Sequence, residues 1–359
     1  MNALRRINTN VIIITLLMLL VFITLFISRT LDDNRLTSWQ WTFNSVNITE
    51  FFLILLAGLV PAHIFSRVSF PERHPVTCLF SLSYVIAALF WGEPEVIVDT
   101  SRYFTQAKYL EVYGIDVFIK EWGRDIYVWT DMPLMPFLYG LIFRFFGEVR
   151  VYIQIFITFL FAMTVVLTYL IGKELWSEEV GFSGGLLLLG MPYLLTQVPL
   201  MLVDIPVMFF LTLSVFTYIK ALNCGGMWLC FSSIAVFLAF FSKYSAWLML
   251  SILLVVFFVY LKISLHPQKG DSGNQWRTIS YRTALITSAA ALLIGVVFWY
   301  KSDVFVSQIR LLLDYQRPGL RRWSESFIST FFFQIHPFIT AAAIYSAYAA
   351  FKKKDLKYL

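Results

Sequence analysis

Residues 151–172 read VYIQIFITFLFAMTVVLTYLIG, an apolar run of the length that crosses a membrane as one helix. The hydrocarbon core of a bilayer is about 30 Å thick and takes roughly 20 apolar residues in a helix. Similar runs recur along the 359-residue chain, which is 59% hydrophobic and only 14% charged. That composition excludes a water-soluble globule of this length. The sequence therefore predicts an all-α fold, a polytopic bundle of transmembrane helices.

About ten spans are expected along the chain. They fall at roughly 11–28, 50–66, 75–93, 151–172, 182–200, 205–222, 227–241, 246–264, 283–300 and 327–351. The first is too long for the apolar region of a signal peptide, and no small-residue cleavage site follows it. We therefore expect it to be retained as a helix that also targets the chain to the membrane.

One apolar segment, 132–146, reads MPLMPFLYGLIFRFF and is short for a span. Its residues Leu134, Leu138, Leu141, Ile142 and Phe145 fall on one helical face, which favours a helix lying in the membrane interface. With this segment interfacial and the N-terminus cytoplasmic, several short Lys- and Arg-bearing loops fall on the inner side. Segments 94–150 and 301–326 then face outward.

This topology predicts three regions. Residues 1–93 are N-terminal transmembrane helices, 94–150 an outer catalytic loop with juxtamembrane helices, and 151–359 a transmembrane bundle. The chain ends directly after a basic stretch, which leaves open that the bundle is incomplete at its C-terminus. We expect a multi-pass integral membrane protein of the plasma membrane, with its active site on the extracytoplasmic side.

Metal and nucleic-acid sites are not expected. The three cysteines and four histidines are scattered without the spacing of metal ligands, and the cysteines read as buried small hydrophobic residues. The formal charge of +6 is divided among loops that the predicted spans separate. A continuous basic surface for nucleic acid is therefore excluded.

Asp99 is the first candidate for chemistry, because it begins the predicted outer loop with Arg102 and Tyr103 close behind. A carboxylate at a membrane surface, backed by apolar packing, can have its pKa adjusted for general-base catalysis. An aspartate that caps an interfacial helix explains the same position. Both interpretations stay open.

Three more charged residues stand at the edges of apolar runs. Asp204 has no charged neighbour and is costly near a membrane unless it has a function, although Pro206 also suits a helix start. Lys243 and Arg150 either extend toward the interface or bind a phosphate, which a guanidinium contacts with two hydrogen bonds.

The order of four motifs resembles the GT-C membrane glycosyltransferases. They are DTSRY-x3-A from Asp99 to Ala107, DMPLMPFLYGLIFRFFGEVR from Asp131 to Arg150, P-x11-DIP from Pro192 to Pro206, and FLAFFSKY from Phe237 to Tyr244. Within this class the chain is most similar to the family-39-like group. That group includes protein O-mannosyltransferases and the aminoarabinose transferase of lipid A.

The resemblance implies a sugar donor on a polyprenyl phosphate and a hydroxyl acceptor on a lipid, glycan or protein, with membrane lipids around the chain. It implies that Asp99 is the catalytic base of an inverting transfer. The phosphate-binding residues would be Lys243, Arg150 and Arg102, and the supporting residues Tyr103, Asp131 and Asp204.

Two departures from the family pattern bear on these roles. Thr100 stands where the family often has a second acid, so no cofactor is expected and a divalent metal ion is not favoured. Asp131 and Met132 precede Pro133 where the family often has Lys-Pro or His-Pro, so the acceptor is not indicated.

Two other classes stay open. In a transporter or lipid-handling membrane protein, Asp99, Asp204 and Lys243 would be substrate or proton sites. Transporters usually place such charges near mid-membrane and show paired repeats, whereas these charges gather at one predicted face. A non-catalytic assembly subunit is the third class.

Overall fold

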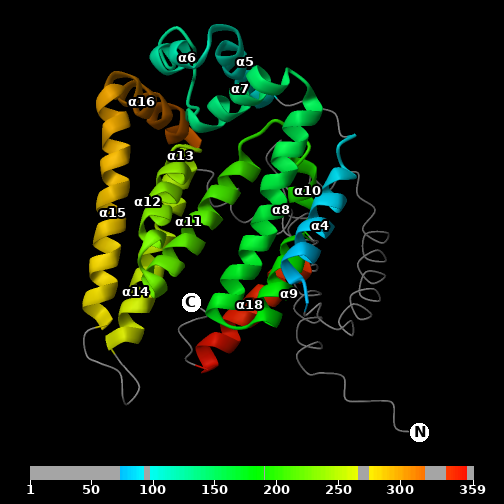
Figure 1. Ribbon diagram of the computed structural model, residues 1–359, viewed down its shortest axis with the longest axis vertical. Coiled ribbons are helices and arrows are strands. Elements are labelled where there is room, and N and C mark those ends of the chain that lie inside the picture. The colour runs from blue at the N-terminus through cyan, green and yellow to red at the C-terminus, as the bar shows by residue number, and fades with distance from the viewer. Residues whose placement is uncertain (1–72, 93–97, 190, 266–274, 320–336, 354–359) are drawn as a thin grey trace. The chain divides into compact units, whose positions relative to one another are not determined.

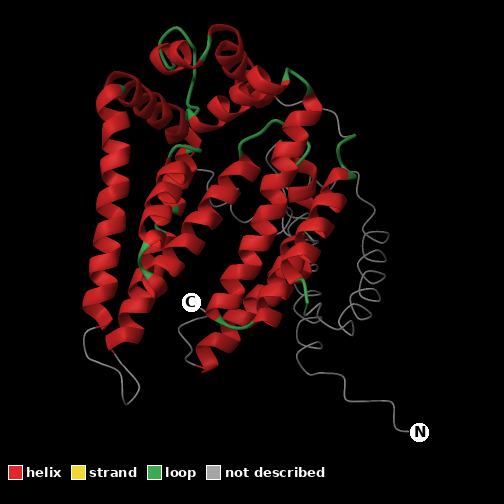
Figure 2. Ribbon diagram, viewed as in Figure 1, coloured by secondary structure: helices red, strands yellow, loops and turns green. Residues whose placement is uncertain are grey.

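The computed structural model describes residues 73–92, 98–189, 191–265, 275–319 and 337–353 (Figures 1 and 2). These residues form helices joined by short turns and contain no strand, only an isolated bridge between Trp122 and Ile126. The all-α prediction is confirmed. The predicted spans 11–28 and 50–66, and the first part of 327–351, lie outside the described residues.

The chain divides into two compact units. One comprises Met1–Pro75 with Arg322–Leu359, and its described helix is α18 (Pro337–Lys353). The other is Val76–Arg321, which contains the candidate site described below. The three predicted regions were drawn from the expected membrane topology. A division into compact units does not test that topology, so the three regions stay a prediction.

Four helical segments among the described residues are long and apolar enough to cross a membrane. They are α8 (Arg150–Leu175), α11 (Asp204–Cys224), Tyr244–Leu265 and α15 (Gln275–Tyr300). The third segment consists of α13 (Tyr244–Met249) followed by α14 (Ile252–Leu265). Shorter apolar helices are α4 (Pro75–Ala88), α7 (Leu134–Phe146) and α12 (Met227–Phe240).

The predicted span 182–200 differs from the structure, which has two helices there. These are α9 (Glu178–Leu189) and α10 (Pro192–Gln197). Pro192 is the first residue of α10. Proline lacks a backbone N–H and suits the first turn of a helix rather than its interior, which explains why a new helix begins here.

Glycines bring α8 and α9 into close contact. A Cβ atom on Gly172 would lie 2.5 Å from Cα of Gly181, and a Cβ on Gly181 would lie 2.3 Å from the carbonyl oxygen of Tyr169. Small residues at such crossings let membrane helices approach until their backbones touch. The α8–α9 pair therefore depends on glycine at both positions.

A second layer lies at the end of the bundle where α8 begins and α12 ends (Figure 1). It consists of α5 (Val98–Tyr113), α6 (Ile115–Glu121) and α7, and α16 (Ser302–Gly319) lies at the same end. A Cβ on Gly140 of α7 would lie 2.6 Å from Cβ of Leu110 of α5. Close contact between α5 and α7 therefore fixes this layer.

Helix α7 has apolar side chains on two faces. Met135, Tyr139 and Phe143 are buried against neighbouring helices. The predicted apolar face is partly exposed, and its last residue, Phe145, is 69% exposed. At 13 residues the helix is too short for a span, as expected. Its place in the membrane interface stays a prediction.

The expectation that the cysteines are buried was wrong. The cysteines Cys78, Cys224 and Cys230 are exposed thiols rather than buried small residues. They lie on α4, α11 and α12, which are apolar helices of the bundle. A membrane-spanning helix can place apolar groups on its outer face because lipid is as apolar as a protein core.

The α8–α9 contact gives a stability prediction. Gly181→Ala should lower the unfolding temperature of the detergent-purified protein by at least about 3 °C, because its methyl group would meet backbone atoms of α8. Gly184→Ala on the same helix is the control, since its Cβ would meet only Thr168 Cγ2, at 3.7 Å. Equal unfolding temperatures for both variants would contradict the close helix contact.

Candidate functional site

The first part of the candidate site is at the start of α5. Asp99 lies in the first turn of this helix, where the helix dipole favours a negative charge, and is half exposed. Nη2 of Arg102, one turn on, lies 3.1 Å from Oδ1 of Asp99 and 3.1 Å from Oδ1 of Asp131. One guanidinium thus joins an exposed carboxylate to a buried one.

Asp131 is held in place from several directions. The turn before it is closed by a 2.8 Å hydrogen bond from its own N–H to the carbonyl of Val128. Its second carboxylate oxygen accepts a 2.9 Å hydrogen bond from Nε2 of Gln106, a residue only 1% exposed. Asp131 therefore has a hydrogen-bonding partner at each carboxylate oxygen.

Sequence reasoning missed Gln106. It lies one helical turn after Arg102, on the same side of α5, and this spacing was the available signal. Its Oε1 and Nε of Arg102 are buried and have no hydrogen-bond partner in the part of the chain that the structure describes. The start of α5 therefore carries unused hydrogen-bonding capacity.

Burial raises the pKa of two groups here. It raises the pKa of Asp131 to about 6, against the opposing effects of the Arg102 charge and the Gln106 hydrogen bond. Burial, with the negative charge on Asp131, also raises the pKa of Tyr103. At neutral pH Asp131 is therefore mostly ionised, and the Tyr103 hydroxyl keeps its proton.

The second part of the site is an ion pair between two helix junctions. Nζ of Lys243 donates to Oδ1 of Asp204 at 2.8 Å, and the two side chains are 40% and 43% exposed. Asp204 is the first residue of α11, and Lys243 has an extended backbone between α12 and α13. Asp204 thus begins a helix, as its helix-start interpretation predicts, and also pairs with a cation, while its functional role stays a prediction.

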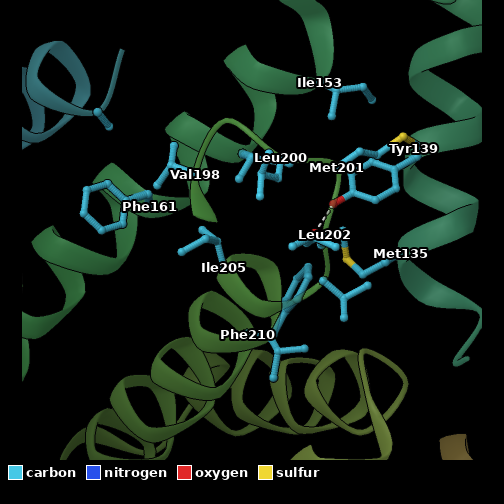
Figure 3. Close-up of a cluster of buried hydrophobic side chains, with 14 of the residues drawn as sticks. Met135, Tyr139, Ile153, Phe161, Val198, Leu200, Met201, Leu202, Ile205 and Phe210 are labelled. Atoms are coloured by element: carbon cyan, nitrogen blue, oxygen red, sulfur yellow. Dashed lines mark hydrogen bonds between the residues drawn. The ribbon is translucent and has the colours of Figure 1, made fainter. Parts of the chain in front are cut away.

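Backbone and side-chain contacts of α7 join the two parts. The N–H of Leu134 donates to the carbonyl of Phe241 at 3.2 Å, which ties the segment after Asp131 to the residues before Lys243. The Tyr139 hydroxyl donates to the carbonyl of Leu202, two residues before Asp204 (Figure 3). Contacts of α7 thus connect the segment that carries Asp131 with the segments that carry Asp204 and Lys243.

A core of apolar side chains supports this arrangement. Figure 3 shows Met135 and Tyr139 of α7 beside Leu200, Met201 and Leu202 of the chain leading into α11. Tyr103 belongs to the same buried cluster, and the charge on Asp204 acts on its hydroxyl. Besides burial, carboxylates of both parts of the site therefore raise the pKa of Tyr103.

Arg150 is the first residue of α8 and is exposed. It follows α7 by four residues, which puts it at the same end of the bundle (Figure 1). Among the described residues, no group of three or more His, Cys, Asp and Glu side chains gathers closely enough to hold a metal ion.

An apolar cavity of about 360 Å³ is lined in part by residues close in sequence to Asp131 and Lys243. Pro133 and Leu134, just after Asp131, line one part of it, and Phe241, two residues before Lys243, lines another. Its other walls include Phe118, Phe137 and Phe305. A cavity of this size and character suits a hydrocarbon group.

The raised pKa of Asp131 predicts a pH profile. As the pH falls through about 6, Asp131 takes up a proton and Arg102 loses one of its two carboxylate partners. We therefore expect the rate of sugar transfer, the reaction that the sequence resemblance implies, to fall below pH 6 in the wild-type protein. The Asp131→Asn variant, whose side chain is uncharged at every pH, should transfer sugar more slowly at pH 7.5. Its rate should not show the decrease below pH 6. An unchanged decrease in the variant would assign the titration to another group.

Part of the chain matches a known protein family. Residues 131–300 match the family described as Dolichyl-phosphate-mannose-protein mannosyltransferase. The match covers just under half of the chain, from Asp131 through Lys243 to the end of α15, and begins after Asp99 and Arg102. No curated protein matches the chain.

The match supports a membrane glycosyltransferase that uses a sugar linked to a polyprenyl phosphate. The resemblance to GT-C glycosyltransferases predicted from the sequence is therefore confirmed, and over residues 131–300 this chain is similar to the dolichyl-phosphate-mannose-protein mannosyltransferase family.

Proposed function

We propose that the chain transfers a hexose or pentose from a polyprenyl monophosphate to an acceptor hydroxyl, with inversion at the anomeric carbon. The observation that carries the proposal is the family match, which contains Asp131, Arg150, Asp204 and Lys243. The exposed parts of Asp99 and of the Lys243–Asp204 pair give substrates access to this end of the bundle. We propose that this end faces the extracytoplasmic side.

Asp99 is the proposed general base. Its carboxylate is half exposed, so an acceptor hydroxyl can reach it, and Arg102 fixes its position one helical turn away. Asp99 takes the hydroxyl proton as the oxygen attacks the anomeric carbon and the bond from that carbon to the phosphate oxygen breaks. Asp131 and Tyr103 support the site by holding Arg102 and packing beneath it.

Lys243 is the proposed partner of the leaving phosphate. The phosphate gains negative charge as the glycosidic bond breaks, so a fixed cation stabilises the transition state more than the bound donor. Asp204 orients Lys243 before the donor arrives. Arg150 is the second phosphate partner, and Arg102 contributes positive charge from between its two carboxylates.

The apolar cavity gives the donor's hydrocarbon chain a place. We propose that the first isoprene units after the phosphate lie against Leu134 and Phe241. These residues adjoin Asp131 and Lys243 in the chain, so a lipid phosphate held there has its apolar tail beside an apolar wall. The acceptor, whether lipid, glycan or protein, would enter from the Asp99 side.

A direct assay distinguishes this proposal from a transporter or an assembly subunit. Purified protein in liposomes is given a polyprenyl phosphate carrying a radiolabelled sugar, with candidate lipid, glycan and peptide acceptors in turn. Transfer of label to an acceptor, with release of polyprenyl phosphate, is the expected result. Movement of the label across the membrane without a change of chemical partner would support a transporter instead.

Replacing Asp99 tests the base. Asp99→Asn keeps the side-chain volume and removes the group that accepts the proton, so turnover should fall on the order of 100-fold or more. Because Asp99 is half exposed, the unfolding temperature should change little. Rates are measured with acceptor at saturation, and retention of more than about a third of wild-type turnover would remove Asp99 from the mechanism.

Replacing Lys243 tests the leaving-group contact. Lys243→Gln should lower turnover at saturating donor more than it raises the donor KM, because the lost charge acts mainly in the transition state. Lys243→Arg should recover only part of the loss, since a planar guanidinium places its donors differently from an ammonium. Wild-type turnover in the Gln variant would direct the search for the phosphate partner to Arg150.

A further inference from the structure

Gln308 of α16 is a buried polar residue without an assigned role. It is 3% exposed, and its Oε1 accepts a hydrogen bond from the hydroxyl of Tyr244. Its Nε2 is also buried and has no hydrogen-bond partner within the described part of the chain. An unpaired buried donor destabilises a fold, so packing alone does not account for this amide.

Apolar packing and a hydrogen bond hold the first part of α16, which carries Gln308, against its neighbours. Val304 and Phe305 are buried in the apolar cluster that includes Phe241 and Tyr244, and the ring of Phe305 stacks on Phe298 with centroids 4.3 Å apart. Lys301, just before α16, donates from Nζ to the carbonyl of Trp122 at 3.2 Å. The start of α16 is thus held against α6 and the end of α15.

The hydrogen bond to Gln308 holds Tyr244, which is the neighbour in sequence of Lys243, the proposed phosphate partner. Tyr244 begins α13 and directly follows Lys243, whose backbone is extended. On the other side of Lys243, Phe241 is tied to α7 through its carbonyl. The residues on both sides of Lys243 are therefore held by hydrogen bonds, Phe241 by α7 and Tyr244 by Gln308.

We propose that Gln308 is a positioning residue that, through the Tyr244 hydroxyl, fixes where the Lys243 ammonium lies. This inference rests on the proposed function, because it assigns Gln308 to the same phosphate contact. Gln308 lies outside the family match, which ends at residue 300. Small displacements of a charged group matter in such sites, since about 1 Å can cost a large factor in rate.

The test compares Gln308→Met with a double variant. Methionine keeps the length of the side chain, replaces the strong amide acceptor of the Tyr244 hydrogen bond with a weakly accepting thioether, and removes the unpaired donor. Turnover at saturating donor should fall on the order of 10-fold with a smaller change in donor KM. The unfolding temperature should change by only a few degrees, because the Tyr244 hydroxyl loses its acceptor while the unpaired Gln308 donor is removed. Ser307→Ala, at an exposed neighbour on α16, is the matched control and should keep wild-type turnover.

Two further variants distinguish positioning from general stability. Tyr244→Phe removes the same hydrogen bond, so it should produce the same loss, and combining it with Gln308→Met should add nothing. In a Lys243→Gln background, Gln308→Met should cause less than about a twofold further loss, because the group that it positions is gone.

Each outcome bears on one claim. If Gln308→Met keeps wild-type turnover while Lys243→Gln is impaired, the inference is wrong and the proposed function stands. If Gln308→Met lowers turnover equally in the wild-type and Lys243→Gln backgrounds, Gln308 acts independently of Lys243 and the inference is also wrong. If Lys243→Gln itself keeps wild-type turnover, the phosphate contact fails, and the positioning role fails with it.

Discussion

The hydrogen bond from the N–H of Leu134 to the carbonyl of Phe241 is the contact on which the candidate site depends. It joins two segments more than a hundred residues apart, one leading from Asp131 into α7 and the other leading from α12 to Lys243. Without it, the layer formed by α5, α6 and α7 would lack its backbone tie to the junction that carries Lys243. The Asp131 part of the site and the Lys243–Asp204 part would then be joined by side-chain contacts such as the hydrogen bond from Tyr139 to Leu202.

The charges at this end of the bundle occupy two environments. The buried Asp131 is stabilised by Arg102 and Gln106, which limits the cost of removing a carboxylate from water. Asp99 and Lys243 are partly exposed and so stay accessible to substrates. The interior charges are held in place before a substrate binds, which is the preorganisation that stabilises developing charge, and the partly exposed charges admit the substrate.

The sequence predicted those parts of the structure that depend on local pattern. Runs of apolar residues predicted the helices. The prolines and the short length of 132–146 predicted a helix too short to cross a membrane. Asp204 and Lys243 were recognised because a charge beside an apolar run is rare. The family motifs linked them, although neither residue reveals from sequence that the other is its partner.

The rest depends on contacts between distant segments. Gln106 and Gln308 are uncharged and lie in helices with polar neighbours, so only the fold shows that they hold Asp131 and Tyr244. The break between α9 and α10 was missed because the apolar run continues across Pro192. The exposed cysteines were misjudged because composition does not show which face of a membrane helix meets lipid.

A structure of the protein with a bound polyprenyl phosphate would show whether Lys243 binds the donor phosphate. We expect the phosphate to lie within hydrogen-bonding distance of Lys243, at the end of the bundle that carries Asp99 and Asp131, with its first isoprene units against Leu134 and Phe241. A phosphate bound instead at the opposite ends of α8 and α11, beside Lys173 or Lys220, would contradict the proposed site.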